Sequence, residues 1–401
     1  MIIGPDGFTG AVMAVESVPG AAVLMHGPGG CRVRTSLLSM SLVPREDRRW
    51  GEYGEPYYSG YSRVPASYID GEDYIGGAVR KLEDALEYVR RGGYRLIAVI
   101  DSPGASLMAD NHMAAIRDLG VSDGTIVLEI PTMSAPVRRT YGRTLAEVIR
   151  QIDPAPGRRL GTVLLIGLTV MDASWQDAKD ELSSYLEDMG LEVLCAPGAG
   201  ASVEELAESV KAEFAVAVCP ESCDGLSDLY RSMGVTVFLP QEAPVGFDAT
   251  ERWIRGAATV MGRDPSRALE KLGFRRRRFD SKIDGMRYGM MRVAGMTFSA
   301  SGPGSVLRPL DGWLKTGLSM VPRSMVDEEV DGFRGSKLMP ADLVISDGNT
   351  ALRAESGKRC VASVSTGYAV IGSDGIMPRP LFGAAGAESI MDTIVKASRG
   401  R

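Results

Sequence analysis

Short runs of apolar residues alternate along the chain with stretches that have the spacing of amphipathic helices. The first such runs cover residues 21–26, 95–101 and 125–131, and glycine or proline stands near each of them. Runs of this length between turn residues predict buried strands. Strands that alternate with helices in this way predict a parallel sheet covered by helices.

The same alternation restarts twice further along the chain. The second group of apolar runs covers 161–168, 191–197, 214–220 and 235–240, and the third covers 292–300, 343–347 and 360–365. We therefore expect an α/β protein with three similar sheets. The segments 153–159 and 273–280 are the expected joints between them, although both are too short to be free linkers.

Length and composition agree with several domains and exclude some functions. A chain of 401 residues exceeds what one hydrophobic core usually supports. It contains 44% apolar residues, but no apolar run long enough to cross a membrane, and its first residues do not resemble a signal peptide. We therefore expect a cytoplasmic protein. The net charge of −6 argues against nucleic acid as a partner, and the basic run 275–278 is typical of a solvated helix face.

Glycine- and proline-rich turns follow several of the expected strands. They lie at residues 26–31, 100–106, 194–200, 218–225 and 299–305. Ligands of open parallel sheets gather beyond the carboxyl ends of the strands, so these turns are candidate binding loops. Each of them taken alone is also compatible with an ordinary strand-to-helix turn. None has the pattern of a nucleotide-binding loop, so we do not expect this chain to bind ATP.

The five cysteines differ in what their positions predict. Cys31 follows a strand and begins a helix, where unpaired backbone amides stabilise a thiolate. Cys219 and Cys223 form the sequence CPESC, which alone falls short of the four ligands of a typical metal site. Cys195 and Cys360 lie at the ends of apolar runs and fit buried core positions better.

From end to end, the chain resembles the component 1 family of nitrogenase. That family includes the light-independent protochlorophyllide and chlorophyllide reductases and the reductive cyclase that makes the nickel tetrapyrrole coenzyme of methanogens. The opening segment, with HGPGGC at 26–31, resembles the family's cluster-binding turn. Five further segments resemble the family in the same order, at residues 69–86, 100–111, 163–193, 214–240 and 378–397.

The resemblance implies a fold and a kind of activity. It implies three Rossmann-like domains, and with the pattern above we place them at residues 1–155, 156–275 and 276–401. The chain would be the catalytic component of a two-component reductase that acts on a tetrapyrrole-like or other unsaturated substrate. A separate ATP-dependent iron–sulfur reductase would supply its low-potential electrons.

The resemblance also implies a metal cluster at the first turn. Cys31 would hold a 4Fe-4S cluster shared by two subunits, in a homodimer or in a heterodimer with a paralogue. Gly30 would let the cluster approach the backbone. Departures from the family pattern affect the other ligands, because Ser102 stands at the second cysteine position and the first falls near Pro5 and Asp6. Asp6 is a candidate substitute ligand, but an aspartate before glycine is also a common turn former.

A second site of the family is altered as well. Cys219 falls at the position of the cysteine that holds the active-site cofactor of nitrogenase, so Cys219, with Cys223, is a candidate ligand of a second metallocluster. The histidine that holds the other end of that cofactor has no counterpart in residues 362–380. We therefore do not expect nitrogen fixation. An organic substrate is expected between the domains, facing residues 195–201, 219–225 and 301–305.

The remaining candidates serve proton transfer and substrate binding. Candidate proton donors are Asp101, His26 and His112, among which the sequence does not choose. Candidate anchors of substrate carboxylates are Arg32, Arg34 and Arg63, since guanidinium pairs with carboxylate bidentately. Two other functions stay open: a scaffold on which an iron–sulfur cofactor is assembled, and a ligand-binding protein without metal.

Overall fold

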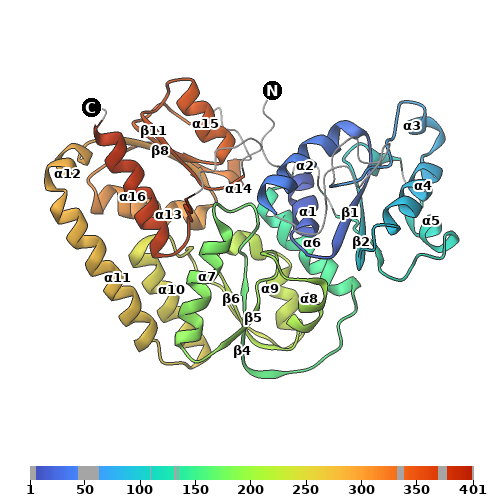
Figure 1. Ribbon diagram of the computed structural model, residues 1–401, viewed down its shortest axis with the longest axis horizontal. Helices are drawn as coiled ribbons and strands as arrows, with labels where there is room; N and C mark the ends of the chain where they lie inside the picture. Colours follow the sequence, from blue (N-terminus) through green and yellow to red (C-terminus); the bar gives the residue numbers. More distant parts are fainter. Residues whose placement is uncertain are drawn as a thin grey trace.

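Three parallel sheets follow one another along the chain, and helices flank each of them (Figure 1). The computed structural model describes residues 6–43, 63–108, 110–130, 132, 135–331, 338–368 and 377–399. The sheets confirm the predicted fold class. The domain boundaries stay a prediction, because one continuous cluster of buried apolar residues has members in all three sheets.

The first sheet consists of β1 (Ala21–His26), β2 (Leu96–Asp101) and β3 (Thr125–Val127), in that order. Both faces of this sheet are covered, since alternate residues of β1 belong to two different apolar clusters. The flanking helices are α1 (Gly7–Glu16), α2 (Gly29–Leu42), α3 (Asp73–Gly76), α4 (Val79–Arg90), α5 (His112–Asp118) and α6 (Val137–Gln151). The parallel register pairs His26 with Asp101, which brings both side chains to one edge of the sheet.

The second sheet has the order β5-β4-β6-β7. Its strands are β4 (Arg159–Ile166), β5 (Glu192–Cys195), β6 (Ala212–Ala217) and β7 (Thr236–Phe238). Its α-helices are α7 (Trp175–Asp188), α8 (Val203–Ser209), α9 (Leu226–Ser232) and α10 (Gly246–Met261), and the CPESC sequence forms the short helix η2 (Pro220–Cys223). The central strands β4 and β6 read as apolar runs because they are buried on both faces.

The third sheet has the order β11-β10-β8-β9. Its strands are β8 (Thr297–Gly302), β9 (Val321–Asp327), β10 (Leu343–Ser346) and β11 (Ala362–Ser365). Its helices are α12 (Arg287–Val293), α13 (Gly304–Gly312), α14 (Glu328–Asp331), α15 (Gly348–Ser356) and α16 (Ala384–Arg399). The sequence pattern did not predict β9, because this edge strand is largely exposed and has no continuous apolar run.

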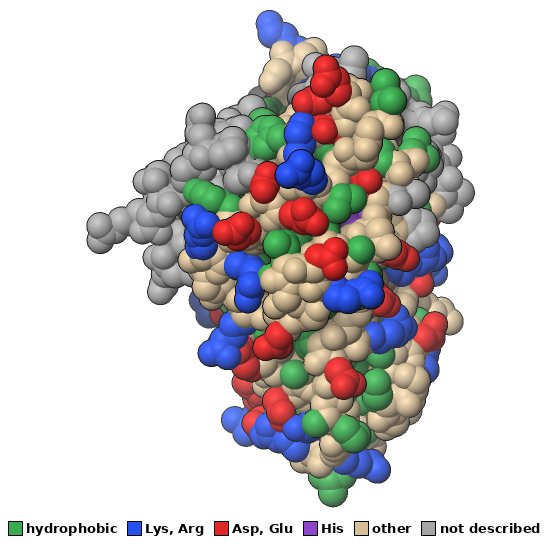
Figure 2. Space-filling view, turned by 90° about the vertical axis from the view of Figure 1, so that its right-hand side faces the viewer, with side chains coloured by type: hydrophobic (Ala, Val, Ile, Leu, Met, Phe, Trp, Pro, Cys, Tyr) green, Lys and Arg blue, Asp and Glu red, His purple; other side chains and the backbone are tan. Residues whose placement is uncertain are grey.

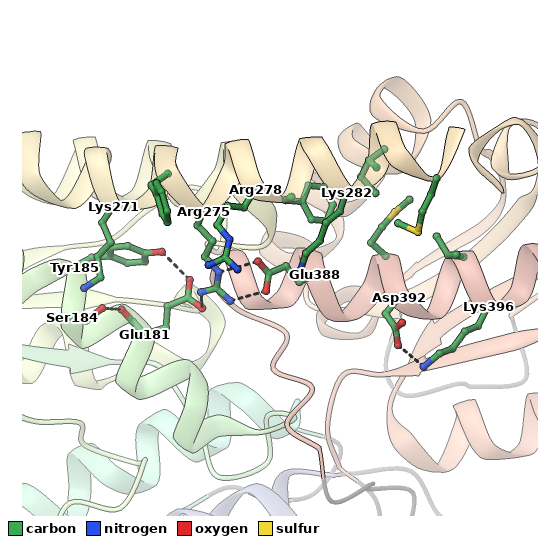
Figure 3. A pocket seen from close by; sticks show the side chains of 16 residues that line it. Glu181, Ser184, Tyr185, Lys271, Arg275, Arg278, Lys282, Glu388, Asp392 and Lys396 are labelled. Carbon is green, nitrogen blue, oxygen red and sulfur yellow. Dashed lines mark hydrogen bonds and ion pairs between the residues drawn. The ribbon is translucent and has the colours of Figure 1, made fainter. Parts of the chain in front are cut away.

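The segment 273–280 is not a joint between domains, as the sequence suggested, but lies inside the long helix α11 (Ser266–Gly285). Gly273 is tolerated within this helix, and the arginines that follow it are good helix formers. Arg275 ties α11 to two neighbours: its guanidinium lies 2.9 Å from Glu181 of α7 and donates to Glu388 of α16 at 2.9 and 3.0 Å (Figure 3). Part of the basic run therefore holds helices together.

A cavity of about 710 Å3 opens between α7, α11 and α16, around these ion pairs (Figure 3). In Figure 1 these helices lie on the opposite side of the molecule from the HGPGGC turn, which joins β1 to α2. Within the described residues, no helix has the length and apolarity needed to cross a membrane.

Close packing of α1 against α6 depends on glycine. A side chain at Gly10 would collide with the carbonyl group of Val137, at the start of α6. Both helices bury most of their residues at this contact. The first sheet is thus joined to α6, which in turn contacts η2 of the second sheet.

We expect Gly10→Ala to lower the free energy of unfolding by about 1–3 kcal/mol, because the added methyl group forces these helices apart. The matched control is Gly273→Ala in α11, where the added atom would meet only the tip of Arg277, at 3.5 Å. That control should gain up to about 1 kcal/mol from helix propensity. Urea unfolding of the two variants measures both effects, and equal changes would contradict the packing argument.

Candidate functional site

The HGPGGC turn leads from β1 into the first turn of α2 and is shaped by its glycines. A side chain at Gly29 would come within 2.5 Å of the ring of Tyr68, and one at Gly27 would collide with the hydroxyl of Ser102. Gly30, in contrast, is exposed and has open space beside its Cα. The turn is therefore packed on its inner side and accessible at Gly30, next to Cys31.

Cys31 and Asp6 lie in one electrostatic neighbourhood. The pKa of the half-buried Cys31 thiol is raised by burial and by the Asp6 carboxylate, while Arg34 acts in the opposite direction. Asp6 caps α1, where its Oδ1 accepts from the backbone N–H of Thr9 at 2.9 Å and from its hydroxyl at 2.7 Å. The other oxygen of Asp6 lies 3.6 Å from Nη1 of Arg34. Pro5, the other residue predicted near this point, lies outside the described residues.

Ser102 supports the turn from behind. It is fully buried, its N–H donates to the carbonyl of His26 at 2.9 Å, and its Oγ accepts from the N–H of Ala105 at 3.3 Å. The structure therefore places Ser102 against the predicted cluster-binding turn, beneath Gly27. A contact between Ser102 and a cluster stays a prediction.

The three candidate substrate anchors all bind groups of the protein itself. Arg32 is completely buried and donates to the carbonyls of Val64 and Arg63, so the prediction that it anchors a substrate is wrong. Arg63 donates to the carbonyl of Ser39 at 2.6 Å. Arg34 donates to the hydroxyls of Thr9 and Tyr368; this second contact, at 2.7 Å, reaches a segment that follows β11.

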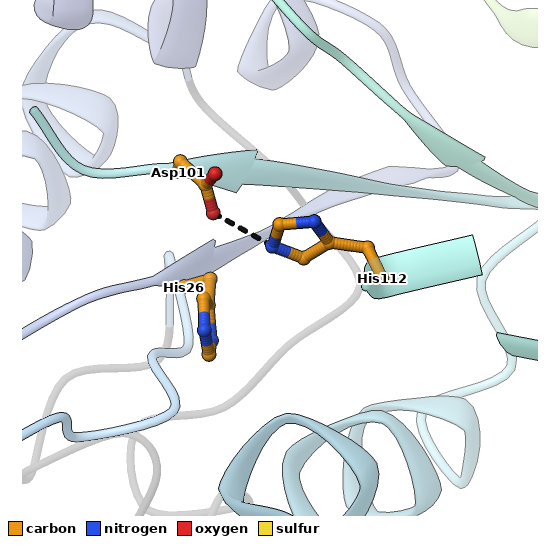
Figure 4. A group of neighbouring side chains, drawn as sticks. All are labelled: His26, Asp101 and His112. Carbon is orange, nitrogen blue, oxygen red and sulfur yellow. Dashed lines mark ion pairs between the residues drawn. The ribbon is translucent and has the colours of Figure 1, made fainter. Parts of the chain in front are cut away.

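His26, Asp101 and His112 converge at the carboxyl ends of β1 and β2 (Figure 4). Nε2 of His112 lies 2.8 Å from Oδ1 of Asp101, and the two imidazole rings meet edge to face with centroids 5.1 Å apart. His26 also contacts Asp110 through Nε2, at 3.0 Å, and Ser67 through Nδ1, at 2.9 Å. The structure thus brings all three candidate proton donors together.

The two histidines have opposite electrostatic environments. Burial lowers the pKa of His26 and outweighs its contact with Asp110. Burial also opposes protonation of His112, but the Asp101 carboxylate outweighs it and raises the pKa of that ring. Figure 2 shows charges of both signs interspersed on the face that includes this region, with a small histidine surface. This surface belongs to His112, because His26 is completely buried.

A second group of polar residues lies where the three sheets meet. This central polar cluster consists of Arg138, Asp172, Cys219, Glu221 and Ser305. Nη2 of Arg138 donates to Asp172 at 2.7 Å, and its Nη1 lies 4.0 Å from the sulfur of Cys219. Glu221 accepts from Ser305 through the backbone N–H, at 2.9 Å, and through the hydroxyl, at 2.5 Å. The predicted loops 219–225 and 301–305 therefore do face one another.

The environments of Cys219 and Cys223 are those of buried thiols. Burial and Glu221 raise the pKa of Cys219 to about 12, and burial raises that of Cys223 well above its ordinary value. The sulfur of Cys219 already has Glu221 at 3.3 Å and Ser305 at 3.7 Å, and Cys223 donates to the carbonyl of Cys219. These contacts do not fit a metallocluster at Cys219, so we derive no step through one.

Two carboxylic acids beside the central polar cluster have pKa values close to neutral. Burial raises the pKa of Glu328, in α14, to about 7, with a further contribution from Asp347. Burial likewise raises the pKa of Glu329 to about 7, although Nε of Arg139 lies 3.0 Å from it. Sequence reasoning missed both residues, because an acidic run after an unrecognised edge strand resembles an exposed turn.

The fold and these sites define a class of protein: three parallel sheets around a buried polar cluster, with a cysteine-bearing turn at one sheet edge. A sequence model described as nitrogenase component 1 type oxidoreductase matches residues 7–329. The chain therefore belongs to that family, as its resemblance predicted. A solved structure described as nitrogenase Cp1 at pH 6.5 has the same fold, with a TM-score of 0.75 and 14% identity over 100% of this chain and 94% of that one.

Curated relatives of this chain are named as one of the subunits of light-independent protochlorophyllide reductase. The relative from Methylobacterium sp. (strain 4-46) is 24% identical over 274 residues, which cover 66% of this chain and 51% of the relative. The relative from Rhodospirillum rubrum is 26% identical over 279 residues, which cover 66% and 48%. The chain thus spans about half the length of the curated relatives it matches.

The raised pKa of Glu328 predicts a pH-dependent stability. The folded protein binds this proton more tightly than the unfolded chain, whose carboxyl has a pKa near 4.5, so stability falls as the pH rises from about 4.5 to 7. Glu328→Gln should therefore raise the free energy of unfolding at pH 8 by about 1–3 kcal/mol and change it little at pH 4.5. Glu270→Gln, on the exposed face of α11, is the control. Urea unfolding at the two pH values measures the difference, and an equal effect at both would contradict it.

Proposed function

We propose that this chain is the catalytic component of a two-component reductase. A separate ATP-dependent iron–sulfur protein delivers low-potential electrons to it, and it reduces a tetrapyrrole-like or other unsaturated substrate. Family membership supports the reductase class, and the names of the curated relatives support the substrate class. The single observation that carries the proposal is the cysteine-bearing turn, which presents Cys31 beside the exposed Gly30.

The residues around Cys31 fit a share in a cluster rather than a whole one. Among the described residues near the turn, Cys31 offers one thiolate, and Asp6 offers one carboxylate oxygen that its capping role does not use. Iron–sulfur clusters take about four protein ligands. We therefore propose that a second subunit, identical or paralogous, supplies the others, and that Cys31 and Asp6 hold this chain's side of the cluster.

The cluster would supply electrons one at a time, and the protein's own residues would do the rest. Arg34 stabilises the thiolate of Cys31, because its positive charge opposes the effect of Asp6 on the pKa of that thiol. Proton transfer to an organic substrate near the central polar cluster is assigned to Glu328 and Glu329. Carboxylic acids with a pKa of about 7 can deliver a proton and regain it near neutral pH.

Iron and acid-labile sulfide per chain, measured on anaerobically purified protein, test this proposal together with electron paramagnetic resonance after dithionite reduction. About two irons per chain are expected, because one four-iron cluster is shared by two chains. Cys31→Ser should abolish both the iron and the signal. The matched control is Cys360→Ser, because Cys360 is also half-buried and free but lies in the third sheet's region.

Other results would point to the two remaining functions. Iron that binds to the wild type but transfers fully to an acceptor apoprotein would identify a scaffold and contradict the reductase. A wild type without iron, whose content Cys31→Ser cannot change, would leave a ligand-binding protein without metal. Iron in both wild type and Cys31→Ser would show that a cluster exists but that Cys31 does not hold it.

A further inference from the structure

Two polar atoms at the edge of the first sheet are buried without an aligned hydrogen bond. They are Nε2 of His112 and Oδ1 of Asp101, which lie only 2.8 Å apart. The side chain of His112 is nine-tenths buried. A donor and acceptor at this distance would normally align, because misalignment weakens the bond steeply. Metal ligands behave differently, since each directs its lone pair at a shared third point.

A third ligand atom belongs to the same group. A ring nitrogen of His26 lies within 4.8 Å of both of these atoms (Figure 4). Ligand atoms at about 2.0–2.1 Å from one ion are separated by about 3–4 Å, so a small closure of this group would complete a metal geometry. His26 and Asp101 end paired strands and His112 begins α5, so the positions of all three are set by secondary structure.

We propose that His26, Asp101 and His112 bind a divalent transition-metal cation such as Zn2+ or Fe2+. Two imidazoles and one carboxylate favour these ions over Mg2+ and Ca2+, which prefer ligands that are all oxygen. The site is independent of the cluster proposed at Cys31, since it uses no sulfur. Three protein ligands leave coordination positions open for water or a small ligand.

The surroundings of His26 supply a partner that can orient the ring. Both ring nitrogens now have polar neighbours, so one contact must open to admit the ion. The neutral contact between Nδ1 and Ser67 is the weaker one, and the contact between Nε2 and Asp110 then orients the imidazole, as carboxylates commonly do for ligating histidines. The lowered pKa of His26 keeps its ring neutral, as a ligand must be.

Titration of the chelator-treated full chain with Co2+ tests the site. We expect one Co2+ per chain with weak visible bands and no sulfur-to-cobalt absorption, and we expect the same binding in Cys31→Ser. His112→Ala should weaken the binding by at least about 10-fold. The matched control is Asp118→Asn, because Asp118 is exposed at the other end of the same helix.

Asp101→Asn is a second variant that keeps the shape of the side chain, and circular dichroism shows whether each variant is folded. Unchanged affinity in folded His112→Ala or in folded Asp101→Asn would overturn the proposal, and so would binding that is lost in Cys31→Ser. Should both ligand variants fail to fold, failure of the wild type to bind Co2+ more tightly than Mg2+ would overturn it. Iron and sulfide content should stay unchanged in His112→Ala, so failure of this site is distinguishable from failure of the reductase proposal.

Discussion

The buried ion pair between Arg138 and Asp172 is the interaction on which the meeting of the three sheets depends. Arg138 comes from α6, next to the first sheet, and Asp172 from the loop that follows β4 of the second sheet. The N–H and hydroxyl of Thr169 satisfy the other carboxylate oxygen of Asp172, at 2.8 and 2.9 Å. Removal of one partner of such a pair leaves a bare buried charge, at a cost of about 3–5 kcal/mol.

The third sheet joins at the same point through the backbone. Asp172 and Gly367 form an isolated β-bridge, and the N–H of Tyr368 donates to the carbonyl of Met171 at 2.8 Å. A side chain at Gly367 would collide with that carbonyl, and its φ of 129° is one that glycine adopts far more easily than other residues. The central polar cluster can therefore be buried only because ion pair, bridge and glycine position the three sheets together.

The sequence was sufficient to predict the strands of the fold but not the contacts between distant loops. Strands such as β4 and β6 were predicted because burial on both faces leaves a continuous apolar run, whereas β9 was missed because an edge strand keeps polar residues. Cys31 and His26 were identified because they lie on one glycine-rich turn. Arg138 and Glu328 carried no such signal, since a buried charge in a helix has the same local sequence as an exposed one.

The HGPGGC turn and the central polar cluster are joined by a continuous series of contacts. Arg34 influences Cys31 and donates to Tyr368, and Tyr368 follows the residue that forms the bridge with Asp172. Asp172 in turn binds Arg138, which lies beside the sulfur of Cys219. Contiguity alone does not establish energetic coupling, because coupling requires an element with two arrangements. Arg34 is the one member of the series that contacts both the cysteine-bearing turn and the third sheet's region, so a change of charge at Cys31 would act on the centre first through Arg34.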